Sequence, residues 1–590
     1  MPRLRALTLA FLMTALAIWP AWADAPYKID IAIEGSKDKK LLAALQGASQ
    51  LVALKDRPPP SNAALRRRAE EDLPRLQQAM NAEGYWQAKI TYTLDTNKQP
   101  ATVAVKVAPG PLYHLAKLEF VLQSGAPAPL PLTPEQVGLA IGAPALSEPV
   151  DGANARIVSL YAQNGQPFAQ VVDRKVVVDV ATAAMSARYT IDPGAKARFG
   201  ATTVNGLHRV AADFVTRRIA WTEGADYDKR KVEATRQDLV RSALFSSVQI
   251  NHADHPASDG TAAMTIELIE GPPHSVGVGA GYNTNIGLGA RTFWENRNLF
   301  GNGEDLNLSA GAAQRQLGVA GNFRRPDFLL PKQDLVADAE LLREETDAYA
   351  SRRARVFVGL EELMLPNFTL GGGVSIERTY LTDTTSHDEN YLLLGMPLYV
   401  RRDTTDDLLD PTDGTRTTLT ATPYHGLLGN TLNFLSMRAE ERTYYRVGAS
   451  EKSVLAFYGA LGSIVGASLE QLPADKRLYA GGAGSVRGYG YQLAGPLDSF
   501  NVPIGGRSSL ELGGEFRYRL TETIGLVPFL DAGTVFPTNL PNKPSLFYSP
   551  GIGLRYYTAI GPIRLDLAFP LEKRPIDSPF QVYVSIGQAF

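Results

Sequence analysis

The C-terminal half of the chain is dominated by an alternation of apolar and polar residues. From residue 274 to residue 590 there are about sixteen such runs, each with the period of two that is typical of β-strands. In the run 509–520, leucine and aromatic residues alternate with charged residues such as Glu511 and Glu515. One apolar and one charged face favour an all-β, 16-stranded transmembrane β-barrel, with lipid outside and a polar lumen inside. A soluble β-sandwich also alternates, but it needs far fewer strands.

The N-terminal part, up to about residue 272, follows a different pattern that repeats three times. In each repeat an amphipathic helical segment is followed by a turn and a strand. A second strand, in which apolar and polar residues alternate, then ends at a Gly/Pro turn. The glycines of these turns, Gly110, Gly194 and Gly271, are 84 and 77 residues apart. This spacing indicates tandem α+β units of order β-α-α-β-β, each a small sheet packed on two helices. The opening strands are expected at 28–33, 113–121 and 197–204. A single irregular α+β domain of about 245 residues is the alternative, but it explains the matching turns less well.

The first 23 residues have the composition of a secretory signal peptide. Arg3 and Arg5 precede an apolar run at 7–18, and small residues flank the expected cleavage position after Ala23. An uncleaved membrane anchor is the alternative, but the run is shorter than the roughly 20 residues that span a bilayer. The predicted organisation is a signal peptide at 1–23, α+β repeats at 24–110, 111–194 and 195–272, and a barrel at 273–590.

Composition narrows the class of protein without indicating a reaction. Hydrophobic residues make up 44% of the 590 residues and charged residues 20%, which suits a folded chain. The formal net charge of −2 gives no general argument for nucleic-acid binding. Because the chain has no cysteine, an exported protein of this length must be held by packing or by a closed hydrogen-bond network.

Motifs for catalysis and metal binding are absent from the sequence. It has no H-E-x-x-H zinc motif, no G-x-S-x-G elbow and no cysteine nucleophile, and its seven histidines are scattered. The acidic stretch between Asp406 and Asp413 does not follow the spacing of a calcium loop, and a hairpin turn explains it better. We therefore expect no enzymatic activity, no cofactor and no metal site.

The longest stretch without strand character, at about 468–506, contains the glycine-rich segment LYAGGAGSVRGYGY. It is not a phosphate-binding loop, because Arg487 stands where such a loop needs glycine or lysine and no helix follows. If the segment folds into the lumen, Arg487 requires carboxylate partners. Glu511, Glu515 and Asp531 are candidates on the polar faces of the next strands. A solvated arginine in an exterior loop fits the spacing equally well.

Five motifs together resemble the outer-membrane assembly superfamily that includes BamA, TamA and the two-partner secretion transporters. These are GGAGSVRGYGY, FLDAG, LELGGEFRY and the turns NLFGNGE and LDPTDGTR. The β-α-α-β-β units are similar to POTRA domains. Three such units and the length of the chain are most similar to the TamA branch. Ala483 departs from the acidic residue that some TamA sequences carry there.

The resemblance implies a site and a role. The loop motif would consist of Val486, Arg487, Gly488 and Tyr489, with Arg487 paired to Asp531 and Glu515. The implied role is insertion of β-barrel clients, such as autotransporters, into the bacterial outer membrane, with the POTRA domains in the periplasm. The implied partners are a TamB-like, inner-membrane-anchored periplasmic protein, unfolded outer-membrane proteins and outer-membrane lipids, and no nucleic acid.

A weak seam between the first and last strands, roughly 275–283 and 580–590, would follow from this role. Glycines give few cross-strand contacts and weaken strands. The predicted seam residues are Gly277, Gly279, Gly281, Gly587 and Phe590. Two other roles remain open, which are polypeptide secretion through the lumen and a passive pore.

Overall fold

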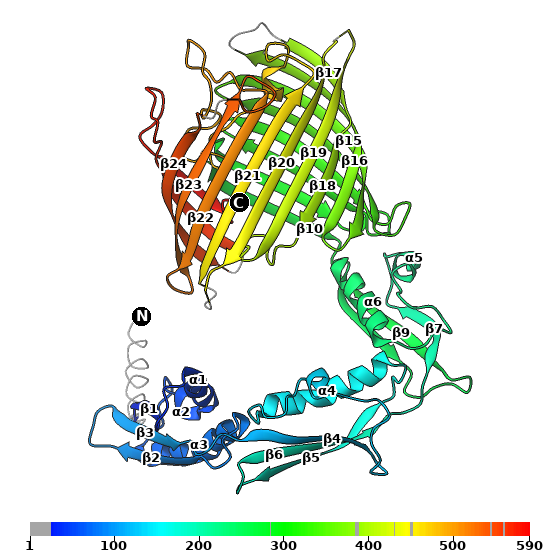
Figure 1. Cartoon of the computed structure of the whole chain (residues 1–590), viewed down its shortest axis with the longest axis vertical. Helices are drawn as coiled ribbons and strands as arrows, with labels where there is room; N and C mark the ends of the chain where they lie inside the picture. The colour runs from blue at the N-terminus through cyan, green and yellow to red at the C-terminus, as the bar shows by residue number, and fades with distance from the viewer. Residues whose placement is uncertain are drawn as a thin grey trace, which may run out of the picture. The chain divides into compact units, whose positions relative to one another are not determined.

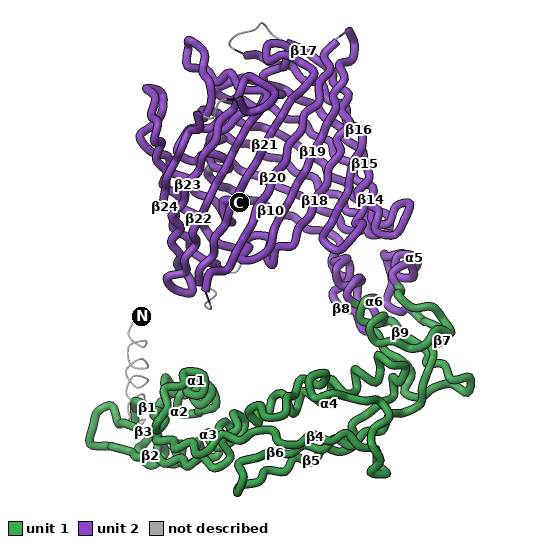
Figure 2. The backbone as a smooth tube through the Cα atoms, in the orientation of Figure 1, with its two compact units in different colours: residues 1–203, 219–236, 250–266 green, residues 204–218, 237–249, 267–590 purple. Residues whose placement is uncertain are grey.

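The structure is a computed structural model that describes residues 25–283, 285–383, 389–429, 431–448, 452–542, 545–558 and 561–590. The predicted signal peptide at 1–23 lies outside the described residues. The chain divides into two compact units (Figure 2). One contains most residues up to 203 together with 219–236 and 250–266, and the other contains 204–218, 237–249 and 267–590.

The N-terminal region contains three small sheets, each built from one three-stranded repeat (Figure 1). In the first sheet, of order β1-β3-β2, the central strand runs parallel to β1 and antiparallel to β2. Alternate residues Val103, Val105 and Val107 of the central strand are buried in a core with leucines of the helices. The elements are β1 (Tyr27–Ile33), α1 (Lys39–Ala48), α2 (Gln50–Ala53), α3 (Asn62–Ala82), β2 (Lys89–Asp95) and β3 (Ala101–Ala108).

The second and third sheets, of orders β4-β6-β5 and β7-β9-β8, follow the same plan. The predicted POTRA-like β-α-α-β-β order is thus confirmed, with two differences. The first repeat has an additional four-residue helix, α2. The first helix of the second repeat is a single 3-10 turn, because Pro134 precedes it and Gly138 ends it in a left-handed conformation. The elements are β4 (His114–Leu122), η1 (Glu135–Val137), α4 (Ser147–Gln163), β5 (Gln170–Asp179), β6 (Ala184–Asp192), β7 (Arg198–Asn205), α5 (Ala212–Thr216), α6 (Lys229–Arg241), β8 (Phe245–His252) and β9 (Thr261–Glu270). Among the described residues, no helix has the length and apolarity needed to cross a membrane.

Glu270, at the end of β9, organises the segment that precedes α5. Its carboxylate accepts hydrogen bonds from the backbone N–H groups of His208, Arg209 and Val210 at 2.8–2.9 Å. Burial alone would raise the pKa of Glu270, but these bonds outweigh it and lower the pKa to about 2. This ionised carboxylate therefore fixes the backbone of residues 208–210, just before α5, against the end of β9.

The remaining strands form one antiparallel sheet in which each strand pairs with the next along the chain. They are β10 (His274–Asn283), β11 (Gly287–Asn296), β12 (Asp305–Ala313), β13 (Gln316–Arg325), β14 (Gln333–Glu345), β15 (Tyr349–Leu365), β16 (Phe368–Asp383), β17 (Glu389–Gly395), β18 (Leu398–Asp403), β19 (Gly414–Leu427), β20 (Asn433–Arg446), β21 (Ser453–Val465), β22 (Ser508–Arg519), β23 (Ile524–Phe536), β24 (Phe547–Thr558), β25 (Gly561–Ala568) and β26 (Gln581–Ile586). Figure 1 shows this sheet curled into a barrel.

Seventeen strand segments make sixteen strands across the sheet. Both β17 and β18 pair with β16 on one side and with β19 on the other, so they are two halves of one strand. The interruption falls at Met396 and Pro397, and proline has no N–H to donate to a ladder. The predicted 16-stranded barrel fold is therefore confirmed, with one broken strand.

The two faces of the sheet have opposite chemistry. Apolar side chains such as Val356 and Ile376 are about half exposed on the outer face. Charged side chains such as Glu515, Arg555 and Asp566 are buried on the inner face. A soluble protein places these classes the other way round, so the arrangement fits lipid outside and a filled lumen inside.

Candidate functional site

The segment between β21 and β22, residues 466–507, lies against the inner wall of the barrel, and we call it the lumen loop. Val486 and Tyr489 of this loop are fully buried in a small cluster with Val535 of β23. The predicted loop at 468–506 therefore corresponds to a packed element within the described residues, and Arg487 lies at its centre.

Arg487 binds Asp531 of β23 through a fork of two hydrogen bonds. Its Nε lies 2.6 Å from Oδ2 of Asp531, and its Nη2 lies 2.8 Å from Oδ1. The backbone N–H of Arg487 also donates to Oδ2 at 3.1 Å. Arg487 is only 1% exposed, so this planar, charge-assisted pair is almost completely removed from water.

The remaining Nη1 of Arg487 reaches two further strands. It donates to Oε1 of Glu515 on β22 at 2.7 Å and to Oδ2 of Asp566 on β25 at 2.9 Å. The guanidinium also lies over the Phe529 ring, 3.4 Å from its centroid. We call Arg487 with Asp531, Glu515 and Asp566 the Arg487 clamp. One loop residue thus ties three strands of the wall together.

Asp566 belongs to the clamp although sequence reasoning did not assign it there. It is the one carboxylate in β25, on the charged face of an otherwise apolar strand. The position of Asp566 on the charged face was visible in the sequence, but the sequence does not show which arginine pairs with it. Glu511, which the sequence also offered as a partner, instead lies 3.1 Å from Arg438.

Three more arginines balance the buried carboxylates. Arg517 donates to Oε2 of Glu515 at 2.9 Å, and Arg555 donates to Asp566. Nε of Arg564 lies 3.6 Å from Oδ2 of Asp566. Buried carboxylates are destabilising unless they are paired, so the wall depends on all these cations.

The glycines of the motif serve two different purposes. Gly481 and Gly482 adopt φ values of 106° and 99°, which only glycine adopts without strain. Gly488 instead passes close to the wall, where a Cβ would lie 2.8 Å from the backbone carbon of Phe569 and against the Ser549 side chain. Nothing lies within 4 Å of the corresponding position at Gly484.

Tyr489 completes the contact of the motif with the wall. Its hydroxyl accepts a hydrogen bond from the Glu572 N–H at 3.1 Å, and its carbonyl accepts one from the Tyr583 hydroxyl at 3.2 Å. Tyr583 belongs to β26, so the motif touches the last strand as well as the three strands of the clamp.

The other end of the lumen loop is attached to a different part of the wall. The 3-10 turn η2 (Ala474–Lys476) pairs Lys476 with Glu377 of β16 and brings Asp475 to the Tyr391 hydroxyl of β17. Sequence reasoning did not find this attachment, because Asp475 and Lys476 stand in no motif that sets them apart from surface residues.

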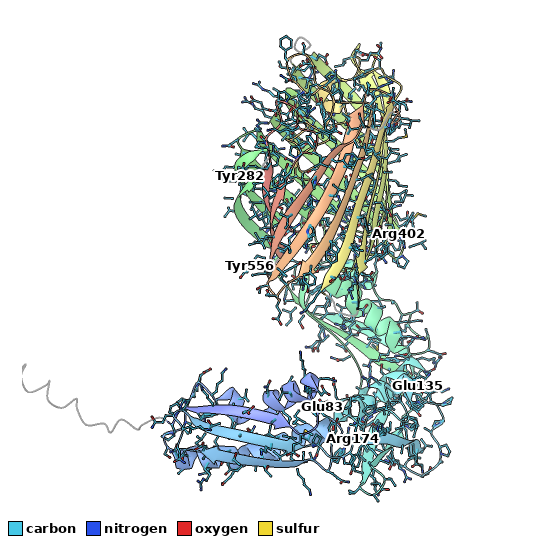
Figure 3. The ribbon with its side chains drawn as sticks, turned by 60° about the vertical axis from the view of Figure 1, so that its left-hand side comes forward. Glu83, Glu135, Arg174, Tyr282, Arg402 and Tyr556 are labelled. Carbon is cyan, nitrogen blue, oxygen red and sulfur yellow. The ribbon has the colours of Figure 1, made fainter. Side chains whose placement is uncertain are left out.

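The predicted seam lies where the sheet order begins and ends. The order runs from β10 to β26, and no hydrogen-bonded pairing joins these two strands in the described part of the chain. Gly279 and Gly281 of β10 have no neighbour within 4 Å of a Cβ position, whereas Gly277 lies under the Phe293 ring. Tyr282 marks β10 in Figure 3. Gly587 adopts a φ of 93° just after β26 ends.

Phe590 lies away from the seam. Its ring stacks on Tyr458 of β21, with centroids 5.5 Å apart, and its backbone oxygen accepts a hydrogen bond from Arg517 at 2.8 Å. Both partners are buried on the inner face of the barrel. The left-handed turn at Gly587 directs the chain inward, which a linear extension of the last strand does not anticipate.

Residues 298–590 match the Omp85 superfamily domain. The matched region contains every residue of the Arg487 clamp, whereas β10 precedes it.

In the described part of the chain, no group of three or more His, Asp or Glu side chains is placed to hold a metal ion.

Relatives of the chain include proteins named outer membrane protein assembly factor BamA. The one from Neisseria meningitidis serogroup B is 23% identical over 461 residues, covering 68% of this chain and 57% of the relative. The one from Nitratidesulfovibrio vulgaris is 23% identical over 432 residues, covering 70% and 53%. The chain thus spans just over half the length of these curated relatives.

A solved structure shares the fold. BamA from Haemophilus ducreyi lacking POTRA domains 1-3 superposes with a TM-score of 0.67 at 18% identity, covering 80% of this chain and 99% of that one. Because the identity is low, this likeness shows a shared fold and not a shared activity.

Replacing Arg487 by Ala is expected to release the lumen loop. The change leaves Asp531, Glu515 and Asp566 buried in the wall without their shared partner. Breaking a buried ion pair lowers the free energy of unfolding by about 3–5 kcal/mol. Hydrogen exchange of residues 478–495 in the full-length protein measures the release. Arg487→Lys should protect the loop partly, because lysine keeps the charge but loses the fork. Exchange at the wild-type rate in Arg487→Ala would refute the clamp.

Two neighbouring glycines provide a matched pair of variants. Gly488→Ala should displace the motif, because the new Cβ meets the Phe569 backbone and the Ser549 side chain. Gly484→Ala should leave the loop in place, because that position is open. Protease sensitivity of the loop reports the difference, and equal sensitivity of the two variants would contradict the close approach at Gly488.

Proposed function

We propose that this chain is a TamA-like assembly factor that inserts β-barrel clients, autotransporters among them, into the bacterial outer membrane. The barrel then lies in that membrane and the three POTRA-like domains lie in the periplasm. The observation that carries the proposal is the unpaired seam between β10 and β26, beside a wall held by the Arg487 clamp. The Omp85 domain and the assembly role in the names of the BamA relatives support it.

The seam provides a template for a client strand. Each unpaired backbone group costs several kcal/mol in hydrocarbon, so a β-strand cannot enter lipid alone. The free edge of β10 offers ten residues of ladder to an incoming strand, while β26 has only six residues to close the same edge. Pairing with β10 therefore lowers the barrier that a client strand meets in the membrane.

The clamp keeps the adjacent wall rigid while the seam moves. Asp566 lies on β25, the neighbour of β26, and Arg487 links it to β22 and β23. Opening can then be confined to the edge between β10 and β26, while β26 stays attached to β25 and to Tyr489. The weak edge and the strong wall are thus side by side, which suits a gate that opens without unfolding the barrel.

The small sheets offer docking edges for a periplasmic partner. In the second sheet β5 is an edge strand, and most of its side chains are exposed. Such an edge can pair with an extended segment of another chain by β-augmentation. Three POTRA-like domains are the feature that favours the TamA branch, and with it a TamB-like, inner-membrane-anchored partner.

A disulfide across the seam should abolish client insertion without unfolding the barrel. One cysteine is placed within 277–281 and one within 582–586, and the pair that oxidises most completely is used. The chain has no cysteine of its own, so the cross-link is unambiguous. Insertion of an autotransporter client into proteoliposomes is measured before and after reduction, which should restore activity.

The control disulfide joins Ala310 and Val319, which are register partners on β12 and β13 away from the seam. It should form without affecting insertion. Full activity of the seam-locked protein would exclude the gate, and a locked protein that still exported polypeptide would favour the secretion role.

The partner proposal is tested by capture. Full-length protein should retain the periplasmic fragment of a TamB-like protein on a resin, and a variant that lacks residues 25–194 should lose most of it. Equal capture by both proteins, or by neither, would contradict docking on the first two small sheets.

A further inference from the structure

An arginine-rich row crosses the outer face of the barrel on strands β13 to β17. Leu317, Arg343, Arg352, Tyr380 and Asn390 are consecutive register partners across these five strands. The row lies close to the hairpin between β14 and β15, at the end of the barrel distal from the junction of β9 and β10. In the proposed orientation this end faces away from the periplasm.

The row faces outward, as the alternation of the strands shows. Arg353, the next residue after Arg352, points inward and donates to Glu340 at 3.0 Å. Arg343 and Arg352 therefore lie on the opposite face, and both are exposed. Outward neighbours Leu341 and Val356 are more than half exposed, as lipid-facing residues of the barrel are.

Two positive charges stand directly opposite each other in this row. Arg343 and Arg352 are cross-strand partners, a position in which like charges repel. Arg378 precedes Tyr380 by two residues on β16 and therefore faces outward as well. Its guanidinium is 5.3 Å from the centre of the Tyr380 ring. No described carboxylate lies within 4 Å of these three arginines. We call Arg343, Arg352 and Arg378 the arginine patch.

A groove lies at the arginine patch on the same side of the sheet. It has a volume of about 1000 Å³, and all three arginines contribute to its lining. Its outward lining includes the apolar residues Leu317, Val319, Leu341 and Ala354, and Glu345 also lines it. Charged groups at the rim of a membrane-facing wall, above an apolar groove, match the two ends of a lipid molecule.

We propose that the arginine patch binds a membrane lipid whose headgroup carries two phosphate groups, in the leaflet distal from the POTRA-like domains. The patch extends from β14 to β16, two strand spacings or about 10 Å, and a headgroup with two phosphates matches this span better than a single phosphate does. Arginine binds phosphate by paired hydrogen bonds, and the ligand relieves the repulsion between Arg343 and Arg352. Acyl chains occupy the apolar groove below.

This site rests on the proposed outer-membrane location but is separate from the seam and from the Arg487 clamp. It gives the barrel a fixed lipid contact on the β14–β16 wall, several strands away from the edge at β10. The lipid thereby anchors the rim of a wall that the lumen loop also holds from inside through Glu377 of β16. Loss of the lipid and loss of client insertion are therefore separable results.

The test measures lipid binding to the full-length protein in detergent. Fluorescent diphosphoryl lipid A is titrated against the wild type and against Arg343→Gln with Arg352→Gln. Charge-assisted hydrogen bonds are worth enough that the double variant should bind at least about tenfold more weakly. Wild-type protein should also prefer diphosphoryl over monophosphoryl lipid A, a comparison that needs no variant.

The control is Arg402→Gln, which removes an exposed arginine of β18 at the opposite end of the wall (Figure 3). It should bind lipid A like the wild type. Unchanged binding in the double variant would overturn the proposal, and so would equal loss in the control. Phosphatidylglycerol that competes as strongly as lipid A would show a general phosphate site and would also overturn it. Client insertion by the double variant, measured in lipid A-free vesicles, should stay at the wild-type level.

Discussion

Burial of three carboxylates in the barrel wall is the constraint on which the rest of the lumen depends. Asp531, Glu515 and Asp566 come from three strands, and each is almost completely removed from water. An unpaired carboxylate in such a place is strongly destabilising, so the wall requires cations within hydrogen-bond distance. Arg487 meets all three carboxylates, and no residue of the strands alone does so. The lumen loop is therefore part of the wall and not a cover laid over it.

The same interaction explains where the barrel can open. Charged pairs and close packing link β22, β23 and β25, and the loop attaches again at β16 and β17 through its 3-10 turn. At the edge between β10 and β26 no ladder joins the strands among the described residues, and Gly279 and Gly281 of β10 leave open space. The wall formed by β22, β23 and β25 is therefore the stable part of the barrel. A conformational change is expected at the weaker edge between β10 and β26.

Alternation with a period of two was enough to predict the barrel and its two faces, and the recurring Gly/Pro turns were enough to predict the three repeats. The pairing of Arg487 with Asp531 and Glu515 required the family resemblance, since loop spacing alone allowed an exposed arginine. Asp566 could not be assigned from the sequence, because its distance from Arg487 depends on the register and curvature of β25. Phe590 was misplaced at the seam, since the inward turn at Gly587 depends on contacts with Tyr458 and Arg517.

Successive residues of a barrel strand point alternately into the lumen and outward, and this alternation decides which groups an arginine contacts. On β15, Arg353 points inward and pairs with Glu340, while its neighbour Arg352 points outward and faces Arg343, with no described carboxylate within 4 Å. A shift of one residue in register would exchange these positions and leave Glu340 without its partner. The inner ion pairs therefore fix the register that creates the outer arginine patch. The ion pairs of the lumen thus also determine which arginines the barrel presents on its outer face.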